Sequence, residues 1–415
     1  MRPFFLFCLV ALFYGGPARA ATPNTCLSCH AKLDDEELAA PAKLMGQDIH
    51  TRQGFSCVDC HGGDATKDDE DASMDEAKGY IGKPGKAKVI ELCGKCHSDG
   101  AFIGHYNPKL RVDQVALYQT SVHGKRLKEG DTKVAVCVDC HGAHGILPIS
   151  DPRAPVYASN VPKTCSRCHS DPTYMKEYGI PTDQFEKYRL SVHGRPLLEK
   201  GELGAPACND CHGNHGATPP GVSSLANVCG QCHPSNNEMV NQSPHKEAFE
   251  KLGIAACLTC HSNHDIQKPS DEMVGQETPA VCIRCHGPDK RPKGFAGAGA
   301  IRASLDTLNN QYHAAEILVQ RAERAGMEVG DALFDLHEAA GSITKTRSTL
   351  HFFNPAKVEE VRKEGTELVN KASQKGQAAL DELEFRRKGL ALSLVVIIGL
   401  GLALFVKIRN IDQQQ

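Results

Sequence analysis

The motif Cys-x-x-Cys-His occurs nine times in this 415-residue chain and uses eighteen of its nineteen cysteines. This is the attachment pattern of c-type haem, in which both thiols form thioether bonds and the histidine becomes the proximal ligand of the iron. The sequence therefore predicts nine covalently bound c-type haems. The predicted attachment cysteines are Cys26, Cys29, Cys57, Cys60, Cys93, Cys96, Cys137, Cys140, Cys165, Cys168, Cys208, Cys211, Cys229, Cys232, Cys257, Cys260, Cys282 and Cys285. The predicted proximal ligands are His30, His61, His97, His141, His169, His212, His233, His261 and His286.

Two other uses of paired cysteines were weighed against haem attachment. Disulfides would explain the pairs but not the histidine that follows each of them. A zinc site also uses Cys-x-x-Cys, but two such pairs, or one pair with distant histidines, make a single site. Neither alternative predicts the same five-residue motif nine times.

Further histidines are available as distal ligands on the opposite face of each haem. The chain has twenty histidines, and eight of those that are not proximal lie in the motif region. His144 lies three residues after His141, so it cannot reach the far face of the haem that His141 ligates, and we expect it to ligate a neighbouring haem. The expected distal ligands in this region are His50, His105, His123, His144, His193, His215, His245 and His264.

An internal repeat organises the motifs into two-haem modules. One copy occupies residues 118–169 and contains Tyr-x-x-Ser-Val-His-Gly, then Cys-x-x-Cys-His-Gly-x-His-Gly, then a single motif. A second copy occupies residues 188–233, and looser copies occupy residues 245–286 and 50–97. The copy at residues 50–97 has Asp64 at the position that His144, His215 and His264 occupy in the other three copies. The sequence thus predicts four modules and one additional haem on the first motif.

The first twenty residues have the features of a secretory signal peptide. Arg2 is followed by an apolar run from Phe4 to Tyr14, and Ala18-Arg19-Ala20 is a small-x-small cleavage site. The remaining cysteine, Cys8, lies inside this segment. We therefore expect export and a location on the periplasmic face of a bacterial inner membrane.

A second apolar run, Leu390 to Val406, contains no charged residue. Its seventeen residues would span about 26 Å as a helix, slightly less than a hydrocarbon core of roughly 30 Å. Lys388 and Lys407 can extend towards the headgroups and make up the difference. The run is expected to be a single transmembrane anchor within residues 389–407.

The remaining sequence divides into two regions of different character. Residues 21–294 are predicted to form a nonahaem domain whose porphyrins replace a conventional core, because only 6% of the chain is aromatic and it has no tryptophan. Residues 295–388 are predicted to form a helical hairpin and a stalk, with 408–415 as a cytoplasmic tail. The expected fold is mainly α with much irregular chain and almost no sheet.

Apolar residues at alternating spacings of four and three define the two helices of the hairpin. Gly326 ends the first helix, and Pro355 begins a third that continues into the apolar run. Because the second helix returns towards the haem domain, His351 at its end is the expected ninth distal ligand, whereas His313 and His337 are expected on the surface. Nine haems would then have nine distal histidines. The predicted first seam is Ile301, Leu305, Leu308, Tyr312, Ala315, Val319 and Ala322, and the second is Val329, Leu333, Leu336, Ala340, Ile343 and Leu350, with Arg347 interrupting it.

The Ser-Val-His-Gly and Cys-x-x-Cys-His-Gly-x-His strings resemble those of doubled-motif multihaem c-type cytochromes of anaerobic respiration. The strings at residues 326–329 and 351–355 resemble the helical tails of membrane-anchored members. The resemblance implies mostly bis-histidine haems and electron exchange with a quinol-linked membrane complex, a b-type cytochrome or other periplasmic cytochromes. Multihaem nitrite reductases have related helices but carry their catalytic haem on Cys-x-x-Cys-Lys, a motif that this chain lacks.

The sequence thus favours a membrane-anchored electron-transfer protein over an enzyme. A multihaem reductase or oxidase of small nitrogen or sulfur compounds, with one open haem, is the first alternative. A subunit of a quinol-oxidising complex whose quinone site lies in another chain is the second. The net charge of −3 is near neutral, and we expect no nucleic-acid partner and no catalytic residues.

Overall fold

A computed structural model of the chain describes residues 24–219, 222 and 224–413. These residues form helices and irregular chain without a β-strand, as the sequence predicts. The predicted signal peptide, with Cys8, lies outside the described residues. The chain divides into two compact units, residues 1–186 with 193–221 and residues 187–192 with 222–415. The division falls inside the predicted haem domain, so the last three haem motifs share a unit with the long helices.

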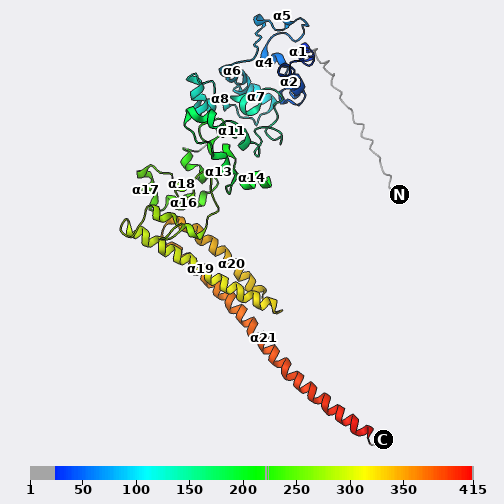
Figure 1. The fold of residues 1–415 in the computed structure, drawn as a ribbon, viewed down its shortest axis with the longest axis vertical. Coiled ribbons are helices and arrows are strands. Elements are labelled where there is room, and N and C mark those ends of the chain that lie inside the picture. The colour runs from blue at the N-terminus through cyan, green and yellow to red at the C-terminus, as the bar shows by residue number, and fades with distance from the viewer. Residues whose placement is uncertain (1–23, 220–221, 223, 414–415) are drawn as a thin grey trace, which may run out of the picture. The chain divides into compact units, whose positions relative to one another are not determined.

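Unit one, residues 1–186 with 193–221, consists of short helices joined by irregular chain (Figure 1). Helix α13 (Gln184–Arg189) crosses its boundary. Its other helices are α1 (Thr25–His30), α2 (Glu36–Leu44), η1 (Met45–Gln47), α3 (Ile49–Arg52), α4 (Cys57–His61), α5 (Glu70–Ser73), η2 (Glu76–Lys78), α6 (Lys86–His97), α7 (Gly100–Tyr106), α8 (Gln114–Thr120), α9 (Val122–Lys128), α10 (Cys137–His141), α11 (Val161–His169), α12 (Pro172–Met175), η3 (Lys176–Tyr178), α14 (Gly194–Lys200) and α15 (Cys208–His212).

The haem motifs of unit one fold as single helical turns or as the last turn of a longer helix. This local structure follows from the spacing, because residues three and four apart lie on one face of a helix. In α4, α10 and α15 the turn begins with the same cap. The carboxylates of Asp59, Asp139 and Asp210 accept hydrogen bonds of 2.6–2.7 Å from the backbone N–H three residues earlier. Such a cap satisfies an N–H that the first turn leaves unpaired.

A glycine directly after each of these three motifs ends the turn. Gly62, Gly142 and Gly213 have φ of 72°, 84° and 76°, a region that favours glycine. At Gly62 a Cβ would also lie 2.1 Å from the carbonyl oxygen of Gly79. The Cys-x-x-Cys-His-Gly string is therefore explained by backbone geometry as well as by haem attachment.

Three long helices, α19 (Pro292–Arg324), α20 (Gly330–Thr349) and α21 (Pro355–Asp412), pack side by side in unit two (Figure 1). Because α21 packs against both α19 and α20, its first half completes a three-helix bundle and is not a separate stalk, which differs from the predicted hairpin and stalk. The shorter helices of this unit are η4 (Leu225–Gln231), α16 (Pro234–Asn241), α17 (His245–Leu252), α18 (Ala256–His261), η5 (Asp271–Met273), η6 (Val281–Arg284) and η7 (Leu350–Phe352).

The core of the bundle confirms the first predicted seam and most of the second. Residues of the first seam are buried, with Leu308 and Val319 fully enclosed, and Tyr312 packs against the cluster. In the second seam Val329, Leu336 and Ile343 are buried as predicted, whereas Leu333 is 38% exposed. The buried residues of α20 are Ala332, Asp335, Leu336, Ala339, Ile343, Thr346 and Thr349. Enclosing a leucine such as Leu308 stabilises the fold by about 1.5–3 kcal/mol.

The second half of α21 extends past the bundle. Its last buried residue is Ala379, and residues 390–411 are exposed along their whole length. By length and composition, α21 contains a segment apolar enough to cross a membrane. The predicted anchor therefore coincides with the part of α21 that nothing in the described chain covers.

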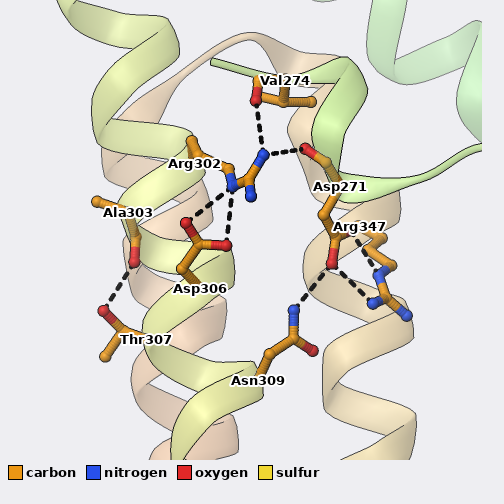
Figure 2. A network of polar contacts seen from close by, with 8 residues as sticks. All are labelled: Asp271, Val274, Arg302, Ala303, Asp306, Thr307, Asn309 and Arg347. Atoms are coloured by element: carbon orange, nitrogen blue, oxygen red, sulfur yellow. Dashed lines mark hydrogen bonds and ion pairs between the residues drawn. The ribbon is translucent and has the colours of Figure 1, made fainter. Parts of the chain in front are cut away.

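A polar network fixes the segment between the eighth and ninth motifs to the bundle (Figure 2). Both carboxylate oxygens of Asp271 accept bonds of 2.8 Å from Arg347, and one also accepts a bond of 2.8 Å from Asn309. Arg302 pairs with Asp306 at 2.8 Å and donates to the Asp271 carbonyl at 3.1 Å. The Arg347 guanidinium lowers the pKa of Asp271. Arg347, which interrupts the apolar pattern of the predicted seam, thus attaches the segment between the eighth and ninth haem motifs to the bundle.

Candidate haem-binding sites

In the part of the chain that the structure describes, six pairs of histidine rings lie opposite each other at nearly the same distance, although their residues are far apart in sequence. Each pair joins one predicted proximal histidine to one predicted distal histidine. The pairs, with the distance between ring centroids, are His50–His97 (6.0 Å), His61–His144 (6.0 Å), His123–His169 (6.1 Å), His141–His215 (6.2 Å), His245–His286 (5.8 Å) and His261–His351 (6.2 Å).

This separation fits one iron atom between two imidazoles. A metal–nitrogen bond of about 2 Å and a ring radius of about 1.15 Å place the centroids of two opposed ligands roughly 6.3 Å apart. Two rings packed directly on each other would lie closer. When bound there, haem supplies reversible one-electron chemistry. The residues of these six pairs therefore fit a six-coordinate, bis-histidine haem.

Three of these are crossed pairs, His61–His144, His141–His215 and His261–His351, in which the two histidines come from different modules or from the helical tail. Their rings are nearly parallel, with interplanar angles of 16°, 4° and 22°. His144 and His215 thus lie opposite the proximal histidine of the preceding module, where the sequence predicts a neighbouring haem. His351 takes the same position for the last module.

The other three are module pairs, His50–His97, His123–His169 and His245–His286, in which both histidines belong to one module. Their rings are strongly tilted, at 90°, 51° and 87°. The distal histidine lies at or near the start of a short helix, and the proximal histidine lies on the second motif of the same module. Each module therefore holds two kinds of site, distinguished by the source of the distal histidine.

Hydrogen bonds from Nδ1 orient several of the rings. The Nδ1 atoms of His61 and His351 donate to the carbonyls of Ile81 at 3.0 Å and Ser348 at 2.9 Å. The His50 Nδ1 lies 3.1 Å from the Asp48 carboxylate. Such partners fix the tautomer and leave Nε2 free to bind a metal.

Burial keeps many of the imidazoles neutral, which iron ligation requires. Removal from water disfavours the charged imidazolium, so it lowers the pKa of a buried histidine. Burial is the largest cause of a lowered pKa at His97, His123, His141, His144, His169, His212, His215, His245, His261 and His351.

A polar residue two positions before the distal histidine supports each module pair, and the sequence reasoning missed it. Ser121 accepts a bond from the Gly124 N–H at 3.0 Å, and Ser243 accepts one from the His245 N–H at 3.2 Å. Asp48 accepts from the His50 N–H at 2.8 Å and from the Ile146 N–H at 2.8 Å. The repeated serine of Ser-x-His was the available signal. The two serines hold the turn that carries the distal histidine, and Asp48 also joins the first module to the second through Ile146.

The cysteines of successive motifs lie beside one another. The thiols of Cys26–Cys57, Cys93–Cys137, Cys165–Cys208 and Cys229–Cys257 lie close enough to interact. Cys60–Cys96, Cys140–Cys165 and Cys260–Cys282 are close enough to interact electrostatically. Within unit one these contacts connect the first six motifs in sequence order, and within unit two they connect the last three.

The cysteines form neither of the alternative sites. None of the eighteen motif cysteines, all of which the structure describes, forms a disulfide. Among the residues that the structure describes, no group of three or more histidine, cysteine or acidic side chains converges as a metal site. A structural zinc ion takes four converging ligands, so the arrangement matches haem attachment and not zinc.

The structure places the remaining predicted ligands as follows. His193 and His233 precede α14 and α16, and His264 lies in the turn after α18, whose motif ends at His261. His105 is exposed on α7, and its ring meets only Tyr106 at 5.1 Å. His30 donates from Nδ1 to the Leu38 carbonyl at 2.9 Å. Among residues 24–219, 222 and 224–413, no other histidine ring lies opposite His30 or His105.

The surface positions expected for two histidines of the bundle are confirmed. His313 is exposed and lies 3.3 Å from Glu316, and His337 is exposed on α20. Neither lies opposite a proximal histidine. This leaves His351 as the histidine by which the bundle takes part in a haem-binding site.

Motif spacing, paired histidines and a strand-free helical fold together define a protein that binds several haems covalently. Comparison with known families agrees. Residues 49–170 match the family model Cytochrome c3, and residues 244–291 match the model Doubled CXXCH motif. The chain is a multihaem c-type cytochrome, and its role is electron transfer. Neither a curated protein nor a solved structure matches the chain.

Proposed function

We propose that this cytochrome carries nine haems and conducts electrons along them at the periplasmic face of the inner membrane. The ordered contacts between cysteines of successive motifs support this proposal most directly. They place neighbouring attachment sites next to each other, and close neighbours are what electron hopping needs. The six bis-histidine pairs add to it, because two protein ligands leave an iron free to change oxidation state without binding a substrate.

The proposed direction of exchange is between the membrane and soluble redox proteins in anaerobic respiration. The exposed apolar part of α21 supports a membrane anchor, and export by residues 1–20 would bring the haem motifs to the compartment where c-type haem is attached. A quinol-linked membrane complex or a b-type cytochrome would be the partner in the membrane. Other periplasmic cytochromes would be the soluble partners.

The haem count tests the central part of this proposal. Because all nine motifs are intact, intact-protein mass spectrometry of mature protein should show nine haem additions after loss of residues 1–20. All nine should be reduced and reoxidised reversibly in a spectroelectrochemical titration. Eight or fewer additions in fully matured protein would contradict the proposal, as would a haem that is not reoxidised.

Deletion of residues 390–415 tests the anchor. The bundle ends at Ala379, so the truncation removes no buried residue, and the shortened protein should become soluble with an unchanged haem spectrum. Fractionation of membranes, with the full-length chain as control, measures the effect. Persistent association of the truncated protein with membranes would show that another surface anchors it.

A further inference from the structure

The first haem motif packs like the second motif of a module. The thiol of Cys26 lies close enough to interact with that of Cys57, the first cysteine of the following motif, and the side chain of Asn24, the N-cap of α1, donates to the Cys57 sulfur at 3.8 Å. The same contact between first cysteines joins Cys93 to Cys137, and it recurs at each later boundary between modules that lies within one unit. By this packing His30 corresponds to His97, the proximal histidine of a module pair.

A module pair takes its distal histidine from upstream in its own module. The two histidines are 97 − 50 = 47, 169 − 123 = 46 and 286 − 245 = 41 residues apart in the three module pairs. None of residues 1–29 is a histidine. Residues 1–29 therefore supply no histidine of this kind for His30.

A crossed pair takes its distal histidine from the next module. The next module provides no such histidine for the haem of His30. The module that follows His30 has Asp64 at the position of His144 and His215. The Asp64 carboxylate accepts bonds from the Thr66 hydroxyl at 2.6 Å and from Lys78 at 2.9 Å. The side chain is thus held within its own loop.

That loop lies against the first motif. The Ala65 carbonyl, next to Asp64, accepts bonds from both the backbone N–H and the hydroxyl of Thr25 at 2.9 and 2.8 Å. Thr25 is the first residue of α1, the helix that carries the motif. Asp64, which occupies the position of the distal histidine of a crossed pair, therefore lies near the first haem motif. Its carboxylate is bound to Thr66 and Lys78.

The first motif is also open to solvent. Helix α1 has no buried residue, and Cys29 is exposed. His144 lies close enough to His30 to interact with it electrostatically, but the His144 ring lies opposite that of His61. His105, another of the predicted distal ligands, is exposed, and the described ring that it contacts is that of Tyr106. The described chain thus offers His30 a proximal role and no distal histidine.

We propose that the haem on Cys26 and Cys29 has an open sixth coordination position that binds small exogenous haem ligands, such as carbon monoxide in the ferrous state and cyanide in the ferric state. This inference rests on the proposed nonahaem function and refines the sequence prediction of nine distal histidines. It also gives the reductase or oxidase alternative a specific place in the chain, because small-molecule chemistry at haem needs an open iron position.

Spectroscopy of the intact membrane-anchored protein tests the proposal. Ferric protein should show one high-spin haem by electron paramagnetic resonance, and reduced protein should bind one carbon monoxide per nine haems. The double variant Cys26→Ala/Cys29→Ala should lose the high-spin signal and the carbon monoxide uptake. The matched variant Cys165→Ala/Cys168→Ala, which removes a haem with a complete module pair, should keep both.

Other results would overturn the assignment in distinguishable ways. Nine haems by mass, all low-spin and without carbon monoxide uptake, would leave the electron conduit intact but exclude the open position. A new high-spin haem in His105→Ala would assign that histidine to the first haem instead. A high-spin signal that survives in Cys26→Ala/Cys29→Ala would place the open haem elsewhere. Fewer than nine haems would contradict the proposed function itself.

Discussion

Replacing His351 with alanine is expected to convert the haem on Cys257 and Cys260 from low-spin to high-spin and to leave the other haems unchanged. The His351 ring lies 6.2 Å from that of His261 at an interplanar angle of 22°, the geometry of the other crossed pairs. Its Nδ1 donates to the Ser348 carbonyl, so Nε2 is the atom available to the iron. Loss of the imidazole removes one of two axial ligands.

The change should appear as one additional high-spin haem by electron paramagnetic resonance and one additional carbon monoxide bound after reduction. His313→Ala and His337→Ala are matched controls, because both side chains are exposed histidines of the same bundle. Circular dichroism should show that all three variants keep their helices. A silent His351→Ala, or an equal effect in either control, would remove the bundle from the haem sites.

The sequence predicts the haem motifs, the absence of sheet in the described residues and the first seam of the bundle, because each depends on local spacing. It also predicts that His144 and His215 serve a haem other than their own, since three residues separate each from a proximal histidine. It does not predict which haem, because that depends on how modules pack against one another.

The difference in α20 comes from packing between helices. The predicted second seam is buried at Val329, Leu336 and Ile343, but Leu333 is exposed, and Ala332 and Ala339 face the core. The sequence predicts a third helix from Pro355, but the local pattern does not say that this helix packs against both of the others. The role of His105 as a distal ligand stays a prediction, since its place depends on how the modules pack.

Gly294 is expected to be the position in the bundle where one added methyl group does most damage. It lies in the first turn of α19. A Cβ there would be 2.0 Å from Nδ1 and 2.2 Å from Cε1 of His286, which is a severe steric clash between non-bonded atoms. The His286 ring faces His245 at 5.8 Å, and His245 in turn packs on Phe353 at 4.1 Å. The ring therefore cannot move away from an added Cβ without changing its position opposite His245.

Gly294→Ala should accordingly displace His286 and give a low-spin to high-spin change, or loss of the haem, at Cys282 and Cys285. Helix propensity alone predicts the opposite sign, since alanine stabilises a helix interior by about 0.5–1 kcal/mol over glycine. Gly297→Ala, one turn later, is the matched control, because its Cβ would meet only Pro355 at an ordinary 3.5 Å. In Gly294→Ala the melting temperature should fall, and either the spin state or the number of bound haems should change. In Gly297→Ala the haem count and spin state should stay the same, and the melting temperature should not fall. Equal, slightly raised melting temperatures with unchanged spectra would mean that α19 does not confine His286, and the bundle would then influence haem ligation through His351 alone.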